Sequence, residues 1–259
     1  MTSETINFNI ATAYNRLRVH QRQGLFELYS DDNALQSVVD LRAPHQLMLK
    51  NLEHLMAVLL FIPAPGKILL LGTAAGSLLH YLRYYLRQSR ITAVDIDAEL
   101  VEKLLQMQVL PPAADGLDYV FDDAAHFIAH SNQSYDLILV DIFTGAQSPR
   151  WLLDKKCTDR LHGLLSVDGA LAYNLLIDSE HDFKLFYRDL RLVFKRQTLC
   201  LPVKDFENSI AFGIRHVVPK RDMQWYLRHA TEQSEQLGID FLPILSLIYS
   251  TNPAGHGVI

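Results

Sequence analysis

Three aspartates share one kind of position in this sequence. Asp95, Asp123 and Asp141 each follow, within two residues, a short apolar run that is typical of a buried β-strand. Ligands of open α/β sheets bind outside the carboxyl ends of the strands, so we expect the three carboxylates to meet in one crevice. There Asp95 would accept the hydroxyls of a ribose and Asp123 the exocyclic amine of an adenine. Asp141 would lie nearest the reacting group, where it can orient an amine or take its proton.

A glycine turn stands in front of these acids. The apolar run from Ile68 to Leu71 predicts a strand buried on both faces, and apolar residues from Ala75 to Leu86 then recur at helical spacing. The turn between them, Gly72-Thr73-Ala74-Ala75-Gly76, has small side chains that allow close approach of backbone N–H groups to a ligand. Ala74 replaces the second glycine of the dinucleotide fingerprint, so the spacing favours a ligand without pyrophosphate, such as S-adenosylmethionine. The alternative is that the glycines serve only the turn.

The rest of the chain alternates strands and helices, which predicts a parallel sheet with helices on both faces. After the glycine turn we expect a seven-stranded, mostly parallel, Rossmann-like α/β fold whose last two strands form an antiparallel edge. The expected strands are 68–71, 91–94, 117–121, 135–140, 170–176, 197–201 and 209–214, and the expected helices are 75–86, 98–107, 124–131, 152–164, 183–193 and 220–237.

The N-terminal part has a different pattern. Residues 1–15 suggest a loose segment or an early helix, whereas 24–30 and 34–41 favour strands joined by a turn at Asp31-Asp32-Asn33, which predicts a β-hairpin. A helix is expected over 45–61, closed by Pro63 and Pro65.

We therefore place a boundary after residue 62. Residues 1–62 form a small N-terminal module of hairpin and helix, and residues 63–259 form the nucleoside-binding domain with a C-terminal helical extension.

Composition excludes several classes of protein. The chain of 259 residues is 49% hydrophobic, with a formal net charge of -5 and a pI near 6.1, so no overall positive field would attract nucleic acid or an anionic membrane. The two cysteines, Cys157 and Cys200, are far apart, which argues against a disulfide framework and fits a cytoplasmic protein. His126 and His130 have no glutamate between them at the zincin position, and we expect no metal.

The motifs resemble those of one family. Lys67–Gly72, Val94–Asp97, Asp122–Ala124 and Tyr135–Asp141 are similar to the corresponding motifs of the spermidine synthase (polyamine aminopropyltransferase) family. The Asp141-Ile142-Phe143-Thr144-Gly145 segment is most similar to bacterial spermidine synthase-like paralogues. The resemblance spans roughly residues 24 to 216. It implies an N-terminal β module, a class I methyltransferase fold, a homodimer, and binding of decarboxylated S-adenosylmethionine or S-adenosylmethionine.

The resemblance also implies residue roles. Gln36 matches the family's N-terminal glutamine near the thioether, and Asp141 matches the first acid of the catalytic D-S-x-D-P motif. Asp95 matches the ribose acid and Asp123 the adenine acid. The full set expected to bind the nucleoside is Gln36, Gly72, Thr73, Gly76, Asp95, Ile96, Asp123 and Ala124.

Four family positions are changed. The second acid of the catalytic motif falls on Thr144, the acid of the glycine loop on Ala75, one tyrosine on or near Leu52, and the late gate tyrosine near Lys204. Each lost hydrogen bond to a charged partner removes about 1.5 to 3 kcal/mol. The residues thus predict an intact nucleoside site and an altered diamine site.

Three functions remain open. The first is aminopropyl transfer to a small-molecule amine, with Asp141 as base. The second is S-adenosylmethionine-dependent methylation of a small molecule. The third is a catalytically silent, nucleoside-binding paralogue.

Overall fold

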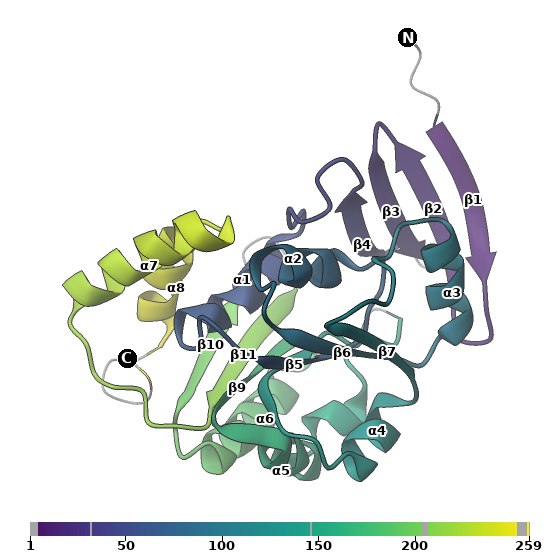
Figure 1. Cartoon of the computed structure of the whole chain (residues 1–259). Helices are drawn as coiled ribbons and strands as arrows, with labels where there is room; N and C mark the ends of the chain where they lie inside the picture. The colour runs from purple at the N-terminus through teal and green to yellow at the C-terminus, as the bar shows by residue number, and fades with distance from the viewer. Residues whose placement is uncertain (1–4, 32, 146, 204–206, 253–257, 259) are drawn as a thin grey trace.

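The centre of the molecule is a seven-stranded sheet with the strand order β10-β11-β9-β8-β5-β6-β7 (Figure 1). The computed structural model describes residues 5–31, 33–145, 147–203, 207–252 and 258. The strands are β5 (Lys67–Leu71), β6 (Arg90–Asp95), β7 (Leu117–Phe121), β8 (Tyr135–Val140), β9 (Leu165–Leu176), β10 (Thr198–Pro202) and β11 (Asn208–Ile214). Strands β5 to β9 pair in parallel, and β11 pairs antiparallel with both β9 and β10. The predicted mostly parallel sheet with an antiparallel edge is confirmed.

Helices cover both faces of this sheet, which explains the unbroken apolar strands. In β5, Ile68 and Leu70 belong to one core and Leu69 and Leu71 to the other, because successive side chains point to opposite faces. One face is covered by α4 (Ala124–His130), α5 (Lys155–Leu164) and α6 (Glu180–Val193). The other is covered by α1 (Lys50–Met56), α2 (Ser77–Tyr85), α3 (Ala98–Gln106), α7 (Met223–Leu237) and α8 (Phe241–Thr251). Short 3-10 turns cover Ala57–Leu60 and Arg150–Leu153.

The N-terminal segment forms a second, antiparallel sheet of four strands, β1-β2-β3-β4. Its strands are β1 (Thr5–Ala11), β2 (Arg16–Arg22), β3 (Leu25–Ser30) and β4 (Leu35–Asp40). The predicted hairpin of β3 and β4 is confirmed. The expectation of a loose segment or helix over residues 1–15 is wrong for 5–11. Ile6, Phe8 and Ile10 of that strand alternate with polar residues, a strand pattern that the prediction did not use. The strand lies at the sheet edge, with only Ile10 buried, and pairs with β2.

The helix expected over 45–61 is shorter than the sequence suggested. It begins at Lys50, because Leu49 before it is extended, and it ends in a 3-10 turn. Helix α1 packs against β9 and β11 of the large sheet. The tail, whose residues show no clear pattern, contains α8, which packs on α7 and β10. The domain boundary after residue 62 stays a prediction.

One buried aspartate joins the small sheet to the large one. Asp97, immediately after β6, is 1% exposed. Its Oδ2 accepts hydrogen bonds from Thr12 Oγ1 at 2.5 Å and Asn15 Nδ2 at 2.6 Å, and its Oδ1 accepts from Leu100 N at 3.0 Å. The third bond caps α3, whereas the first two hold the turn between β1 and β2 against the end of β6 in the large sheet. Asp97 therefore fixes the position of the small sheet.

This contact predicts a stability effect. We expect Asp97→Ala to lower the free energy of unfolding by about 2 to 4 kcal/mol, because three donors lose their partner in a buried position. Urea unfolding followed by circular dichroism measures the change. Asp118→Ala, which removes an exposed acid on β7, is the control and should change the unfolding free energy little. Equal effects of the two substitutions would contradict this role for Asp97.

Candidate functional site

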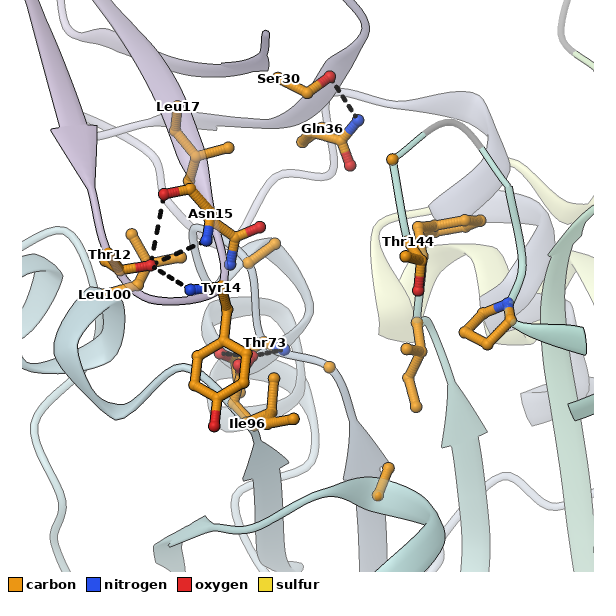
Figure 2. A pocket seen from close by; sticks show the side chains of 18 of the residues that line it. Thr12, Tyr14, Asn15, Leu17, Ser30, Gln36, Thr73, Ile96, Leu100 and Thr144 are labelled. Atoms are coloured by element: carbon orange, nitrogen blue, oxygen red, sulfur yellow. Dashed lines mark hydrogen bonds between the residues drawn. The ribbon is translucent and has the colours of Figure 1, made fainter. Parts of the chain in front are cut away.

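A cleft of about 740 Å³ lies at the carboxyl ends of β5, β6, β7 and β8. Its position follows from topology, because β6 and β8 lie on opposite sides of β5 and the loops that leave β5 and β8 diverge there. Figure 2 shows Tyr14, Thr73 and Ile96 on one side of this cleft and Thr144 on the other. Gln36, Gly72, Thr73, Asp95, Ile96, Asp123, Ala124 and Asp141 all line it. The structure therefore brings eight of the nine predicted site residues together.

Gly72 is required at the bottom of the cleft. Its φ is +89°, which favours glycine, and a Cβ built on it would lie 2.3 Å from the carbonyl oxygen of Asp141. The neighbouring backbone is tied down on both sides, since Gly72 N donates to Val94 O and Asp141 N donates to Leu71 O, each at 2.9 Å. The glycine turn and the predicted base are thus in direct backbone contact.

Gly76, the ninth predicted residue, is not among the described residues that line the cleft. It is the N-cap of α2 with φ +85°, and a Cβ there would meet Leu110 Cδ2 at 2.4 Å. The positive φ and the contact with Leu110 are sufficient reasons for a glycine at position 76, and no ligand is needed to explain it. Contact between Gly76 and a ligand stays a prediction.

Asp95 is held in place at the end of β6. Its Oδ2 accepts hydrogen bonds from Thr73 N at 2.9 Å and Thr73 Oγ1 at 2.7 Å, and its Oδ1 accepts from Asp97 N at 2.9 Å. A carboxylate offers about four lone-pair sites, so capacity for a ribose hydroxyl is left. These bonds fix the carboxylate at the glycine turn, where a cis-diol can reach it.

Asp123 lies at the rim of the cleft, where it caps α4. Its Oδ1 accepts from Ala125 N at 2.7 Å and His126 N at 3.2 Å, while no described donor contacts its Oδ2. Ala124 beside it lines the cleft with a small apolar surface. Ile96 adds a larger apolar surface on the β6 side, being 39% exposed. A flat base can lie between such surfaces while its amine donates to Asp123.

Asp141 lies on the floor of the cleft in a different environment. Burial raises the pKa of its carboxyl to about 6, although Asn174 opposes the shift by donating from Nδ2 to Asp141 Oδ1 at 2.8 Å. Asn174 on β9 is fully buried, and its Oδ1 accepts from Asn208 Nδ2 on β11 at 2.9 Å. Because Asn208 occupies the amide oxygen, Asn174 must present its NH₂ group to the carboxylate. Three adjacent strands therefore orient Asp141.

The cleft also has a wall that the sequence did not predict. Thr12, Tyr14 and Asn15 from the β1–β2 turn line it, and Tyr14 is 60% exposed. Asn15 N donates to Thr12 Oγ1 at 2.9 Å, which closes a local turn. The alternation of apolar and polar residues in β1 and β2 would have located this turn if β1 had been recognised as a strand. Nothing in the local sequence indicates the contact with Asp97. Phe143, Pro149 and Trp151 add apolar lining from the loop after β8.

The changed family positions lie in different parts of the structure. Thr144 lines the cleft, Ala75 and Leu52 are buried, and Lys204 lies outside the described residues. Glu207, an acid directly before β11, is exposed and is not among the cleft residues described. Of the described lining residues, only Asp31, Asp95, Asp123 and Asp141 carry a carboxylate, and Arg16 is the one cation.

Two further features concern the whole described chain. Within residues 5–31, 33–145, 147–203, 207–252 and 258, no three His, Cys, Asp or Glu side chains gather as they would around a metal ion. In the same ranges, every helix is too short or too polar to cross a bilayer.

Comparisons with known proteins agree with this geometry. A polyamine aminopropyltransferase of Neisseria meningitidis serogroup A is 25% identical over 243 residues, covering 93% of this chain and 92% of the relative. A probable spermidine synthase of Corynebacterium glutamicum superposes with a TM-score of 0.75 at 20% identity, covering 89% of this chain and 86% of the other. Human methyltransferase-like protein 13, solved in complex with SAH, superposes with a TM-score of 0.62 at 22% identity, covering 76% and 92%.

The last two likenesses are below 25% identity and establish the fold, which is that of methyltransferase-like proteins. The sequence model of the spermine/spermidine synthase domain matches residues 50–181, which is just over half of the chain and contains the glycine turn with all three aspartates. The chain therefore belongs to the spermine/spermidine synthase family.

Proposed function

We propose that this protein transfers the aminopropyl group of decarboxylated S-adenosylmethionine to a small-molecule amine. The observation that carries the proposal is the convergence of Asp95, Asp123 and Asp141 on one cleft beside the Gly72 turn. Membership of the family and the likeness to the Neisseria aminopropyltransferase support it. In this proposal Asp95 binds the ribose and Asp123 the adenine amine. Gln36, Thr73, Ile96 and Ala124 complete the nucleoside site. The homodimer and the cytoplasmic location stay predictions.

The proposed reaction is a single displacement. The acceptor nitrogen attacks the methylene carbon bonded to the sulfonium, so a C–N bond forms and the C–S bond breaks. The electron pair of that bond goes to sulfur, which leaves as neutral methylthioadenosine, and the proton of the acceptor nitrogen goes to Asp141. Alignment of amine and sulfonium in the cleft supplies much of the acceleration, because it replaces an encounter of two solutes.

Burial helps the proton transfer to Asp141. A free alkylammonium has a pKa of about 10.4, some 4 units above the pKa of about 6 at Asp141, a gap of roughly 6 kcal/mol. Desolvation raises the pKa of a carboxyl and lowers that of an amine, so the two pKa values approach each other inside the cleft. A water-exposed carboxylate with an ordinary pKa would be a weaker base. The environment of Asp141 therefore suits general base catalysis.

Binding measurements test the nucleoside site. We expect calorimetric titration to show tighter binding of decarboxylated S-adenosylmethionine and methylthioadenosine than of S-adenosylmethionine. Asp95→Asn should weaken methylthioadenosine about ten- to a hundredfold, because one ribose acceptor becomes a donor and the charge is lost. Asp118→Asn, at an exposed acid on β7, should leave the affinity unchanged.

The same titrations separate the alternatives. Preference for S-adenosylmethionine would favour methylation. A silent paralogue would be favoured if the protein binds methylthioadenosine tightly but forms none of it from the decarboxylated donor and any amine. Failure of all three compounds to bind would refute the proposed function.

The pH dependence tests Asp141. Only the ionised carboxylate accepts a proton, so kcat/KM should fall as pH drops through about 6. Asn174→Leu removes the hydrogen bond that stabilises the carboxylate. It should raise the pKa of Asp141 further and move the acidic limb about one to two pH units higher. Initial rates between pH 5 and 9 measure this shift. The control is Ser209→Ala, because Ser209 lies next to Asn208 on β11 but on the opposite face of the strand. An acidic limb of kcat/KM at the same pH in Asn174→Leu and wild type would contradict the assignment of Asp141 as the base.

A further inference from the structure

Strand β1 is the outermost strand of the small sheet (Figure 1). Within the described residues it pairs with β2 alone, in an unbroken antiparallel register from Thr5 to Ala11. In such a ladder, successive residues turn their N–H and C=O groups alternately toward the paired strand and away from it. Thr12 N donates to Asn15 O at the end of the ladder, which fixes this alternation. The residues whose backbone groups point away from β2 are therefore Thr5, Asn7, Asn9 and Ala11.

Most of this open edge has no hydrogen-bond partner. The Ala11 carbonyl accepts a hydrogen bond from Lys103 Nζ at 3.3 Å. No described group donates to or accepts from the backbone of Asn7 or Asn9 on the open side. A row of such groups is able to pair with a further strand.

The other sheet edges have features that block such pairing. At β10, the Asn252 side chain occupies both backbone groups of Cys200. Strand β4 has a bulge in its pairing with β3, and β7 has the exposed acid Asp118. Strand β1 contains no charged residue and no proline, and its register has no bulge. Because natural proteins protect their sheet edges by these means, the unprotected edge of β1 indicates a place for a partner strand.

The face of the small sheet beside this edge is basic. Residues directly opposite each other in a ladder share a face, and Arg18 is opposite Asn9 whereas Arg22 is opposite Thr5. Both arginines point away from the core, because the residues that alternate with them on β2 are the inward ones. The side chains of Thr5 and Asn9 are short. The longer arginine side chains can therefore reach over β1 toward a strand added at its edge.

Neither arginine has an acidic partner. No described carboxylate lies within ion-pair distance of the Arg18 or Arg22 guanidinium. Arg18 Nε is buried and has no hydrogen-bond acceptor. Glu27 on the neighbouring strand β3 accepts a hydrogen bond from Tyr29 Oη at 3.3 Å. Buried donors normally have an acceptor, and a carboxylate can accept two parallel bonds from one guanidinium. The group that this face lacks is therefore an acceptor with negative charge.

We infer that β1 receives an extended acidic segment of a partner protein as a fifth strand of the small sheet. Alternate carboxylates of such a segment are about 6.7 Å apart, which is also the spacing of alternate residues on β1 and β2. Backbone pairing supplies the affinity, and the carboxylates beside Arg18 and Arg22 supply the specificity. Two copies of β1 would pair less well, because each copy brings its own basic strand β2.

This surface does not depend on the proposed function. Neither β1 nor the two arginines are among the described residues that line the main cleft.

Fluorescence anisotropy with labelled synthetic peptides tests the surface. The probe is a peptide of alternating Glu and Thr, and its counterpart has Lys in place of Glu. Two further peptides carry N-methyl groups, one on every Glu and the other on every Thr. In an added strand, one of these two sets of amides faces β1 and the other faces away.

We expect wild type to bind the Glu peptide and not the Lys peptide, and to bind it more weakly as salt increases. The double variant Arg18→Gln/Arg22→Gln should bind the Glu peptide about tenfold more weakly. Arg90→Gln, at an exposed arginine on β6 of the large sheet, is the control and should have little effect. Methylation of one residue set should abolish binding. Loss with methylated Glu indicates antiparallel addition, and loss with methylated Thr indicates parallel addition.

Asn7→Pro tests the edge itself. It removes one outward N–H but no hydrogen bond to β2, so the sheet should still form, and the Glu peptide should bind about tenfold more weakly. Asn7→Ala removes only the side-chain amide and should bind the peptide as wild type does. Thermal unfolding shows whether each variant is folded.

Four results would overturn the inference. Wild type fails to bind the Glu peptide at low salt, or binds the Lys peptide equally well. The two N-methylated peptides have equal affinity. Folded Asn7→Pro and the folded double arginine variant bind the Glu peptide as wild type does. Finally, sedimentation velocity shows a wild-type dimer that Asn7→Pro converts to monomers, which would assign this edge to a second copy of the chain.

Discussion

The close backbone contact between the ends of β5 and β8 is the constraint on which the site depends. Gly72 approaches the Asp141 carbonyl so closely that no other residue fits, and Asp141 N is bonded to Leu71 O. The strand order switches sides at this point, because β6 and β7 lie on one side of β5 whereas β8 and β9 lie on the other. One contact therefore holds together the glycine turn and Asp141, the proposed base. A side chain at position 72 would separate them.

The acids of the cleft differ in how many donors they have. Asp95 accepts three hydrogen bonds from Thr73 and Asp97, which keeps it in a fixed position as an acceptor. Asp141 accepts one, from Asn174, in a buried place where desolvation raises the pKa of its carboxyl to about 6. In the proposed function, the same residue type thus serves for binding at one strand end and for proton transfer at another. The difference lies in the surroundings.

The small sheet contributes to the site through a few polar contacts. Asp97 holds the β1–β2 turn in the wall of the cleft, and Gln36 on β4 reaches the region of Asp141. Apolar packing joins the two parts, because all but one of the buried apolar residues of the small sheet belong to the same core as α1 to α3. The cleft therefore has its floor on the large sheet and part of its wall on the small one.

The sequence by itself determined the large sheet and most of the residues of the proposed nucleoside site. Buried parallel strands have continuous apolar runs, and Asp95, Asp123 and Asp141 follow such runs, so their convergence could be predicted from topology. The contact of Thr12 and Asn15 with Asp97 and the Asn174–Asn208 pair were decided only by the tertiary structure. These polar groups matter through partners far away in the chain, and hydrogen bonds between distant residues leave no periodic pattern in the sequence.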